Sequence, residues 1–589
     1  MTFFARTPAV ATGPGDRSSA SRGRRLASTL VVMIGLLALF GALGYLLPAL
    51  GAPIGPKGIP SHVSTDPHNL PYYALRSVLR MFIALFFSLV FTFIYGLAAA
   101  RSKRLRVVLV PLLDILQSVP ILGFLSATIS IWLVLFPGSI LGVEAASIFA
   151  IFTSQAWNMA FSFYNSLISE PTELDEAARS LRLTRWQRFW KLDVPSSMIP
   201  LLWNCMMSVG GGWFFLTASE MISVNNHTFA LPGIGSYVEE AASEQDLGKI
   251  GWAILTMVIV VLLIDFLLWK PLTAWAEKFR VTQSESAAPK RSAVLTVLRL
   301  SGINDFLAHI GRPIASFFDR ITRPLGVTGA RFQSQDGRHD RQLLVNSLYA
   351  ALLGLVGAWG IWKLYELVVP ALGLSEMAHV CWLGLLTLLR VTLLLIVSSI
   401  IWVPIGALIG MNPKLSRILQ PVVQVFASFP ANFVFPFVTM WFLAWHIDIN
   451  WGSILLMALG TQWYIVFNVI AGASAIPDDL REMSRSLRQP TWQRWKTLIL
   501  PAVFSSWCTG GITAAGGAWN ASIVSEVVSY GKHTLTAQGL GSYIAEATSI
   551  GDTPKIIAGV VVMSIFVVAA NRLFWAPVQG LAQRRFSIA

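Results

Sequence analysis

The segment EAARSLRLTRWQRFWKLDVP, which runs from Glu176 to Pro195, returns later in the chain as EMSRSLRQPTWQRWKTLILP, from Glu482 to Pro501. The two copies lie 306 residues apart, and both keep the sequences RSLR and WQR. The repeat is longer than these copies, because the whole segment 157–280 is matched by 463–586 with the same offset. The chain therefore contains an internal duplication of one structural unit.

Matched residues extend the repeat through most of each half. The pairs that are 306 positions apart include Trp157/Trp463, Trp186/Trp492, Pro195/Pro501, Trp213/Trp519, Glu220/Glu526, Gly235/Gly541 and Pro271/Pro577. Upstream the offset is 310, in the pairs Arg80/Arg390, Gly96/Gly406, Pro111/Pro421 and Pro120/Pro430. In a membrane chain, a duplication of this length predicts two halves around a central pathway.

The composition indicates a chain that lies in lipid. Of its 589 residues, 54% are apolar, only 13% are charged, and 22 are tryptophan. A soluble domain of this length would carry fewer apolar residues. The three cysteines, Cys205, Cys381 and Cys508, lie in apolar stretches without metal-ligand spacing, so we expect them to pack as small apolar residues and to form neither a disulfide framework nor a zinc site.

Twelve apolar stretches are long enough to span a bilayer, which takes about 20 residues each. There are six in each half, so the sequence predicts an all-α membrane protein with a pseudo-twofold axis. The stretches are 27–48, 73–100, 107–135, 144–168, 195–222, 250–271, 343–370, 383–410, 418–445, 453–474, 501–530 and 556–577.

The distribution of positive charge predicts the orientation in the membrane. With the N-terminus inside, the cytoplasmic pieces hold 36 Lys and Arg, and the external pieces hold four. The cytoplasmic pieces are 1–25, 101–106, 170–194, 270–342, 411–417, 475–496 and 572–589. Because cationic loops resist translocation, we expect both termini in the cytoplasm of a bacterial cell and the chain in its inner membrane. The net charge of +14 then reflects topology and anionic lipid, not nucleic acid.

Four parts follow along the chain: a cytoplasmic tail (1–26), a first transmembrane domain (27–280), a cytoplasmic linker (281–342) and a second transmembrane domain (343–589). The first apolar run is too long for a signal peptide, so we expect an uncleaved helix there. Within the linker, 292–321 alternates apolar and basic residues at helix-like spacing. This pattern fits a helix along the membrane surface and, equally, a solvated tether of helical turns.

Each half exposes one repeated cytoplasmic segment, 170–195 in the first half and 476–501 in the second. Pro171 and Pro477 suit the start of a helix, whose first turn leaves the missing N–H unused. The prolines that end the two segments suit the first turn of the next span in the same way. A short helix that carries Trp and Arg outside the bilayer predicts a surface for another protein.

These segments resemble the EAA loop of ATP-binding cassette (ABC) importer permeases. In that loop Glu-Ala-Ala is followed by Gly at the seventh position, and the loop ends near Leu-Pro. The first copy has Glu-Ala-Ala from Glu176, and the second has Glu-Met-Ser from Glu482. The flanking sequences ASEMIS and GIGSYV, with their copies VSEVVS and GLGSYI, are similar to the nitrate, taurine and sulfonate branch of those permeases.

The Gly of the loop is replaced in both halves, by Arg182 and Arg488. We therefore expect the bend that Gly permits to be made differently. The resemblance identifies the candidate ATPase-coupling residues as Glu176, Ala177, Ala178, Arg182, Trp186, Glu482, Arg488 and Trp492.

The resemblance implies two fused, MetI-like domains of the type I importer fold, with about twelve transmembrane helices. It also implies two ATPase subunits that receive the EAA helices, and a periplasmic binding protein that delivers a small organic or inorganic anion. This chain has no G-x-x-x-x-G-K-[ST] phosphate loop, so we expect no cofactor on it, with ATP and Mg on the partner subunits. The chain itself is then a non-catalytic permease.

Two other classes remain as alternatives. Twelve helices in a six-plus-six duplication also describe a secondary transporter of the major facilitator architecture, which would not need paired cytoplasmic helices after the fourth span of each half. A membrane scaffold or enzyme is the other alternative. The repeat contains no metal cluster, nucleophile–base pair or facing carboxylates that would favour it.

Two arginines, Arg80 and Arg390, occupy equivalent positions in the second span of each half, where a cation is costly and usually faces a cavity or a partner. Glu220 and Glu526, also repeated, could neutralise them within each half. Alternatively, the guanidinium groups line the translocation pathway and attract an oxyanion, which suits the fork geometry of Arg. These four residues are the candidate pathway residues, and both interpretations stay open.

Overall fold

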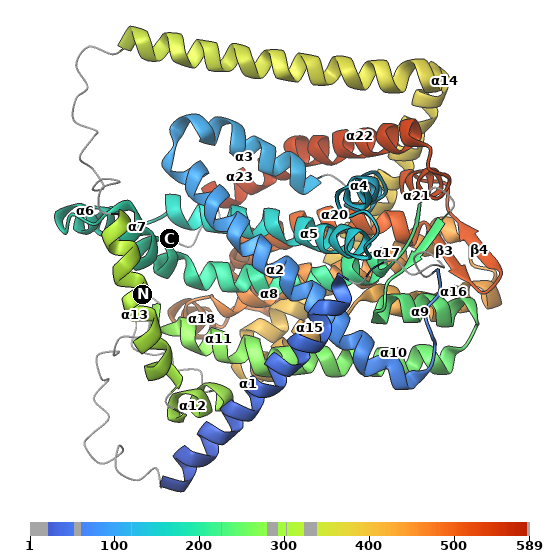
Figure 1. The fold of residues 1–589 in the computed structure, drawn as a ribbon. Helices are drawn as coiled ribbons and strands as arrows, with labels where there is room; N and C mark the ends of the chain where they lie inside the picture. Colours follow the sequence, from blue (N-terminus) through green and yellow to red (C-terminus); the bar gives the residue numbers. More distant parts are fainter. Residues whose placement is uncertain are drawn as a thin grey trace.

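The computed structural model of the chain is a bundle of long helices with short connections (Figure 1). It describes residues 22–51, 53, 61–118, 121–224, 227–279, 292–301, 303–322 and 339–585.

The described residues of the first half and the linker form thirteen α-helices. They are α1 (Arg22–Leu50), α2 (Leu70–Arg101), α3 (Lys103–Ser118), α4 (Ile121–Leu135), α5 (Leu141–Ile168), α6 (Thr172–Ser180), α7 (Arg185–Arg188), α8 (Val194–Glu220), α9 (Ile234–Ser243), α10 (Leu247–Ile264), α11 (Lys270–Ala276), α12 (Ala293–Leu300) and α13 (Ile303–Thr322).

The second half repeats this order with one long helix in front. Its helices are α14 (His339–Met411), α15 (Pro413–Ser428), α16 (Phe435–Trp445), α17 (Ile449–Ser474), α18 (Asp478–Ser486), α19 (Thr491–Arg494), α20 (Leu500–Ser525), α21 (Leu540–Ile550), α22 (Thr553–Ala570) and α23 (Ala576–Arg585).

Within the described residues, eight helices are long and apolar enough to cross a membrane, or nine if one bent pair counts as a single span. The sequence predicts twelve, and one of these predictions is wrong as a single straight span. The stretch 418–445 is divided between α15 and α16, which are bent by 79°. Pro430 stands at this break, where a proline removes a backbone donor from the helix. The stretch 107–135 is covered by α3 and α4, and residues 119 and 120 between them lie outside the described residues.

Two further predicted spans, 343–370 and 383–410, are joined in the single element α14. The element has one non-helical residue inside, Gly373, with a φ of 75° that only glycine adopts without strain. Figure 1 shows the first part of α14 running along one edge, apart from the bundle. The first span of the other half, α1, is also peripheral, with most of its described side chains exposed.

The sequence does not predict the two β-hairpins. Strand β1 (Met221–Val224) pairs with β2 (His227–Ala230), and β3 (Val527–Tyr530) pairs with β4 (His533–Thr536), in the same antiparallel register and again 306 residues apart. Each hairpin follows directly after a glutamate, which is Glu220 at the end of α8 and Glu526 immediately after α20. The hairpins lie at the end of the bundle opposite to α6 and α7 (Figure 1).

The two halves are interlocked through the helices of their third predicted spans. Within each half, α5 packs between α2 and α8, and α17 packs between α14 and α20. The pair α3 and α4, however, also packs against α22, and α4 reaches α20 and α21. In return, α15 packs against α8 and α10 of the first half. Each half therefore contributes one element to the other.

Single π-helical turns recur at matched positions in both halves. They cover Phe189–Asp193 and Asp265–Trp269 in the first half, and Trp495–Ile499 and Asn571–Trp575 in the second. Such turns are rare in proteins and often mark functional positions. The first of each pair joins α7 to α8 or α19 to α20, so these two helices are continuous, whereas α6 and α18 are separated from them by a turn.

A close backbone approach explains the repeated Gly-x-Gly sequences at the starts of α9 and α21. A Cβ atom added at Gly235 would collide with the backbone of Thr217, whereas one at Gly251 in α10 would meet nothing within 4 Å.

We expect Gly235→Ala to lower the free energy of unfolding by about 1–3 kcal/mol, because the methyl group overpacks the α8–α9 contact. The control Gly251→Ala should leave stability unchanged or raise it by up to about 1 kcal/mol. Thermal unfolding of the purified protein in detergent measures both, and equal behaviour of the two variants would contradict the close approach.

Candidate functional site

The first EAA loop (170–195) is built from α6 and α7. Helix α6 starts directly after Pro171, as the sequence predicts, and ends in a Schellman motif. In this motif the N–H of Leu183 donates to the carbonyl of Ala178 at 3.1 Å, and the N–H of Arg182 donates to that of Arg179 at 2.9 Å. Arg182 is the residue after the cap and has a φ of 48°.

The second EAA loop (476–501) has the same backbone. Arg488 has a φ of 49°, and the N–H of Gln489 donates to the carbonyl of Ser484 at 3.3 Å. The expectation of a differently made bend is therefore wrong. Both arginines adopt the left-handed conformation that Gly would favour, at a cost of about 1–2 kcal/mol for a residue with a Cβ.

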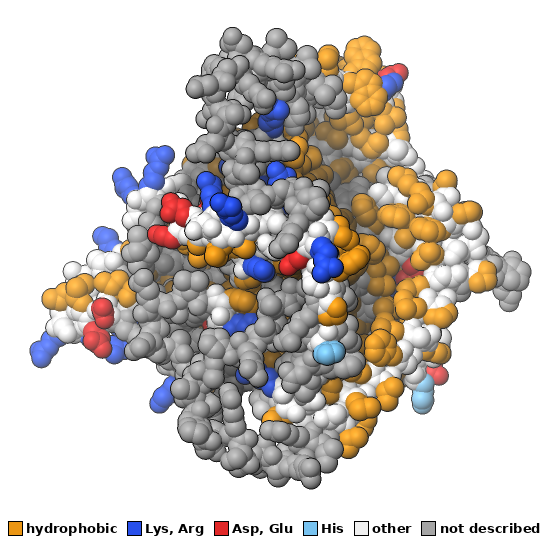
Figure 2. Space-filling model, turned by 60° about the vertical axis from the view of Figure 1, so that its left-hand side comes forward, with side chains coloured by type: hydrophobic (Ala, Val, Ile, Leu, Met, Phe, Trp, Pro, Cys, Tyr) orange, Lys and Arg blue, Asp and Glu red, His pale blue; other side chains and the backbone are white. Residues whose placement is uncertain are grey.

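The outer faces of the two loops are open to solvent. Glu176, Ala177 and Glu482 are exposed, whereas Ala178 and its counterpart Ser484 are buried against the loop. Exposed Leu181 and Leu487 add apolar surface at matched positions, a feature for which the sequence repeat is the only signal. In Figure 2, Lys and Arg side chains stand out on the face turned forward, and hydrophobic side chains cover its flank.

The tryptophans of the two loops differ in environment. Trp492 is 77% exposed, but Trp186 is partly buried because its ring lies 5.5 Å from that of Phe318 in the linker helix α13. The helices α12 and α13 thus confirm helical structure in the linker, and α13 packs against α7 of the first loop.

A network of ion pairs anchors the first loop to the bundle. Arg188 at the end of α7 pairs with Asp175 of α6, with Glu170 at 3.3 Å and with Asp193 at 3.4 Å. Arg101 at the end of α2 reaches the same two acidic groups, Glu170 and Asp193. Burial, and next the neighbouring Asp193 carboxylate, raise the pKa of Glu170 above its usual range.

Among the described side chains, the second loop does not repeat this network. The positions that match Glu170 and Asp193 are occupied by Ile476 and Ile499, both buried. Arg481, which matches Asp175, donates instead to the carbonyl of Ala473 at 2.9 Å. The first loop is therefore held mainly by charge, and the second by apolar packing and a backbone contact.

We expect Arg182→Gly and Arg488→Gly to raise the free energy of unfolding by up to about 1 kcal/mol each, because Gly adopts a positive φ without strain. The β-branched variants Arg182→Val and Arg488→Val should lower it, since they remove the same charge but tolerate this conformation worst. Chemical unfolding of the four variants compares them, and a stabilising Val would refute the strained turn.

The four candidate pathway residues form two buried ion pairs, one in each half. Arg80 is fully buried, and its Nη1 lies 2.7 Å from Glu220 Oε1. Arg390, 6% exposed, lies 2.9 Å from Glu526 Oε1. The geometry thus favours the ion-pair interpretation over arginines that line a pathway.

In the first half the pair belongs to a four-membered cluster. Glu144 in α5 accepts from Arg80 Nε at 2.5 Å and Nη2 at 2.7 Å, and it also pairs with Arg76. Ser77 Oγ donates to Glu220 at 2.5 Å, and the N–H of Gly235 donates to the other oxygen at 2.7 Å. Two arginines and two glutamates balance each other.

In the second half the same place holds one arginine and one glutamate. Asn450, the counterpart of Glu144, accepts from Arg390 Nη2 at 2.8 Å, and Leu386 stands where the first half has Arg76. Thr387, the counterpart of Ser77, donates to Glu526 at 2.9 Å. Each cluster is therefore neutral. In the sequence, Arg76 and Glu144 are recognisable as two charged residues in apolar spans. The second half has no charged residue at either matched position.

These two clusters form a natural double substitution. We expect Arg76→Leu or Glu144→Asn alone to cost about 3–5 kcal/mol, because each leaves an uncompensated buried charge. The double variant should recover most of that loss, because it copies the neutral arrangement of the second half. A thermal-unfolding cycle tests this coupling, and simple additivity of the two losses would contradict it.

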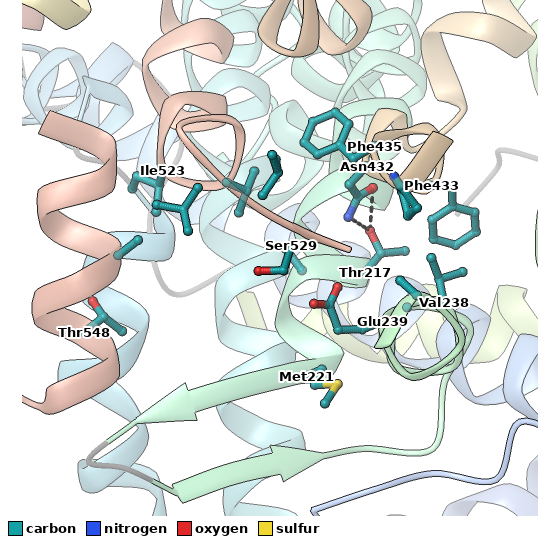
Figure 3. A pocket seen from close by; sticks show the side chains of 18 residues that line it. Thr217, Met221, Val238, Glu239, Asn432, Phe433, Phe435, Ile523, Ser529 and Thr548 are labelled. Atoms are coloured by element: carbon teal, nitrogen blue, oxygen red, sulfur yellow. Dashed lines mark hydrogen bonds between the residues drawn. The ribbon is translucent and has the colours of Figure 1, made fainter. Parts of the chain in front are cut away.

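A cavity of about 350 Å³ lies between the halves, near the hairpins. Its lining comes from α8, α9, α16, α20 and α21, with the strands β1 and β3. Figure 3 shows Thr217 of the first half bonded to Asn432 of the second, whose Nδ2 donates to Thr217 Oγ1 at 2.7 Å. Glu239 points into the space beside Thr217 and Ser529 (Figure 3). None of the four candidate pathway residues lines this cavity.

Comparison with known proteins assigns the family. Residues 90–268 and 402–585 each match the model of the binding-protein-dependent transport system inner membrane component. The two matches cover most of the chain and coincide with the duplicated units. The chain belongs to this family, with two tandem MetI-like membrane domains. The match favours the permease interpretation over the major facilitator alternative.

Several relatives are similar to parts of this chain. The putative aliphatic sulfonates transport permease protein SsuC of Bacillus subtilis is 27% identical over 27% of this chain and 55% of its own length. The nitrate import permease protein NrtB of Synechococcus elongatus is 25% identical over 32% of this chain and 65% of its own length. The taurine transport system permease protein TauC of Escherichia coli is 23% identical over 30% of this chain and 62% of its own length. The alignments thus span a little over half to two thirds of these relatives.

Proposed function

We propose that this chain is the membrane-spanning subunit of an ATP-driven importer for a small anionic solute. Two separate ATPase subunits would bind the EAA loops, and a periplasmic binding protein would deliver the solute from the other side. The observation that carries the proposal is the pair of loops, which share one backbone conformation, including the positive φ of Arg182 and Arg488, and expose their glutamates to solvent.

The coupling follows from how the loops are attached. In each loop the second helix, α7 or α19, continues through a π-helical turn into α8 or α20, and α6 or α18 adjoins it through a tight turn. Movement of a loop by an ATPase subunit would therefore be passed to a helix that borders the cavity between the halves. Closure of the ATPase pair would draw the loops together and rock one half against the other. ATP and Mg belong to those subunits.

The solute class rests on the relatives, whose names refer to aliphatic sulfonates, nitrate and taurine. The buried arginines do not support it, because Arg80 and Arg390 are already neutralised by glutamates within each half. We propose instead that these arginines hold the second, fourth and fifth spans together, and that selection of the solute takes place elsewhere.

We expect the double charge reversal Glu176→Lys and Glu482→Lys to abolish binding of the ATPase subunits while leaving the fold intact, because both glutamates are exposed at the loop surface. Co-purification of the ATPase from native membranes, together with thermal unfolding, measures the two effects. Of the single variants, we expect Glu176→Lys to have the larger effect, because its loop keeps the full Glu-Ala-Ala motif.

The matched control is Glu546→Lys, an exposed glutamate of α21 at the other end of the bundle. It introduces the same change in charge and should leave ATPase binding unaltered. Normal ATPase binding by the double loop variant would remove the basis of the proposed coupling.

A further inference from the structure

The cavity between the halves lies on the pseudo-twofold axis. Its lining contains residues from both copies of the repeat at equivalent positions, 306 residues apart. These matched pairs are Thr217/Ile523, Ala218/Val524, Met221/Val527, Glu239/Ala545 and Ala242/Thr548. The two sides of the cavity therefore face each other through the same backbone positions but with different side chains.

The charge in this lining comes from one side only. Glu239 of α9 is the single charged residue among the described residues that border the cavity, and the matched residue of the other half is Ala545. The polar groups next to it are the hydroxyls of Thr217 and Ser529 and the amide of Asn432. The described lining thus contains a carboxylate and neutral polar groups, without an arginine, lysine or histidine.

The carboxylate of Glu239 has no ion pair or hydrogen bond with any other described residue. Glu239 is exposed, because its side chain borders the cavity. Desolvation by the surrounding protein, and next the nearby Glu240, raise the pKa of Glu239 above its usual range. Glu240 itself turns away and contacts His62 Nδ1 at 3.1 Å. In contrast, the buried acids Glu144 and Glu220 are fully paired.

An unpaired carboxylate that borders a cavity selects solutes by the sign of their charge. It repels a purely anionic solute and attracts a positively charged group, and this interaction is stronger than in water because the surroundings are partly apolar. Hydroxyl and amide groups on the same wall are suited to the anionic end of a solute. The volume, about 350 Å³, is at the lower end of the range for small-molecule sites.

We propose that this cavity admits a small solute that carries a positively charged nitrogen in addition to its anionic group, and that Glu239 recognises that nitrogen. The inference rests on the importer function proposed above, and it narrows the solute from anions in general to zwitterions. Glu239 is then a specificity-determining residue of the membrane subunit, placed where the two halves meet.

Taurine and isethionate provide the test, because both carry a sulfonate on the same two-carbon chain and differ only in an ammonium or a hydroxyl group. Equilibrium binding of each radiolabelled compound to the purified full-length chain in lipid nanodiscs gives the ratio of the two affinities. We expect taurine to bind at least tenfold more tightly than isethionate, and Glu239→Gln to reduce this ratio to about one.

Two further variants separate recognition from folding. Glu240→Gln removes the adjacent carboxylate, which faces His62 outside the cavity, and should keep the preference for taurine. Ala545→Lys places a cation at the matched position across the cavity and should shift the preference towards isethionate. Because Ala545→Lys leaves Glu239 in place, this variant still tests charge recognition in the cavity even if Glu239→Gln folds poorly.

Equal binding of taurine and isethionate by the unmodified chain would overturn the proposal. A preference for taurine that survives both Glu239→Gln and Ala545→Lys would do the same. This assay needs no ATPase, so its failure is distinct from failure of the importer function, which would be detected as loss of ATPase binding to the intact EAA loops.

Discussion

The neutral ion clusters at the outer ends of α8 and α20 are the constraint on which the two halves depend. Each cluster ties the second span to the fourth and fifth, and the same glutamate also caps the helix that follows the hairpin. A charge buried in this way is tolerated only if it is compensated on the spot. The two halves meet this requirement with different numbers of charged residues, four in the first half and two in the second. The net charge of each cluster is zero.

Much of this arrangement could be predicted from the repeat. The repeat suggested Glu220 and Glu526 as partners of Arg80 and Arg390, because a cation in a span needs a partner, and this was one of the two interpretations that the sequence left open. The start of α6 after Pro171 followed from proline's missing donor. The EAA motif predicted the permease family. These predictions succeeded where a single local rule determined the outcome, such as the capping of a helix, the period of a repeat or the pairing of a buried charge.

Other features depend on contacts that the linear pattern does not contain. The break between α15 and α16 lies in a predicted span that packs against the opposite half. The hairpins are four-residue strands, too short for a clear alternation. The left-handed turn at Arg182 was unexpected because arginine rarely adopts it, and the hydrogen bonds of the Schellman motif maintain it. The partners of Glu144 required the folded positions of two helices, α2 and α5.

The covalent joining of two diverged halves has a consequence for how such a protein can change. In a transporter made of two identical subunits, every mutation is made twice, so any residue near the symmetry axis meets its own copy. Here the residue opposite Glu239 is free to be Ala545, and the loop opposite the charge-anchored one is free to be apolar. One half of the molecule can therefore change its solute recognition or its coupling loop while the other half preserves the fold.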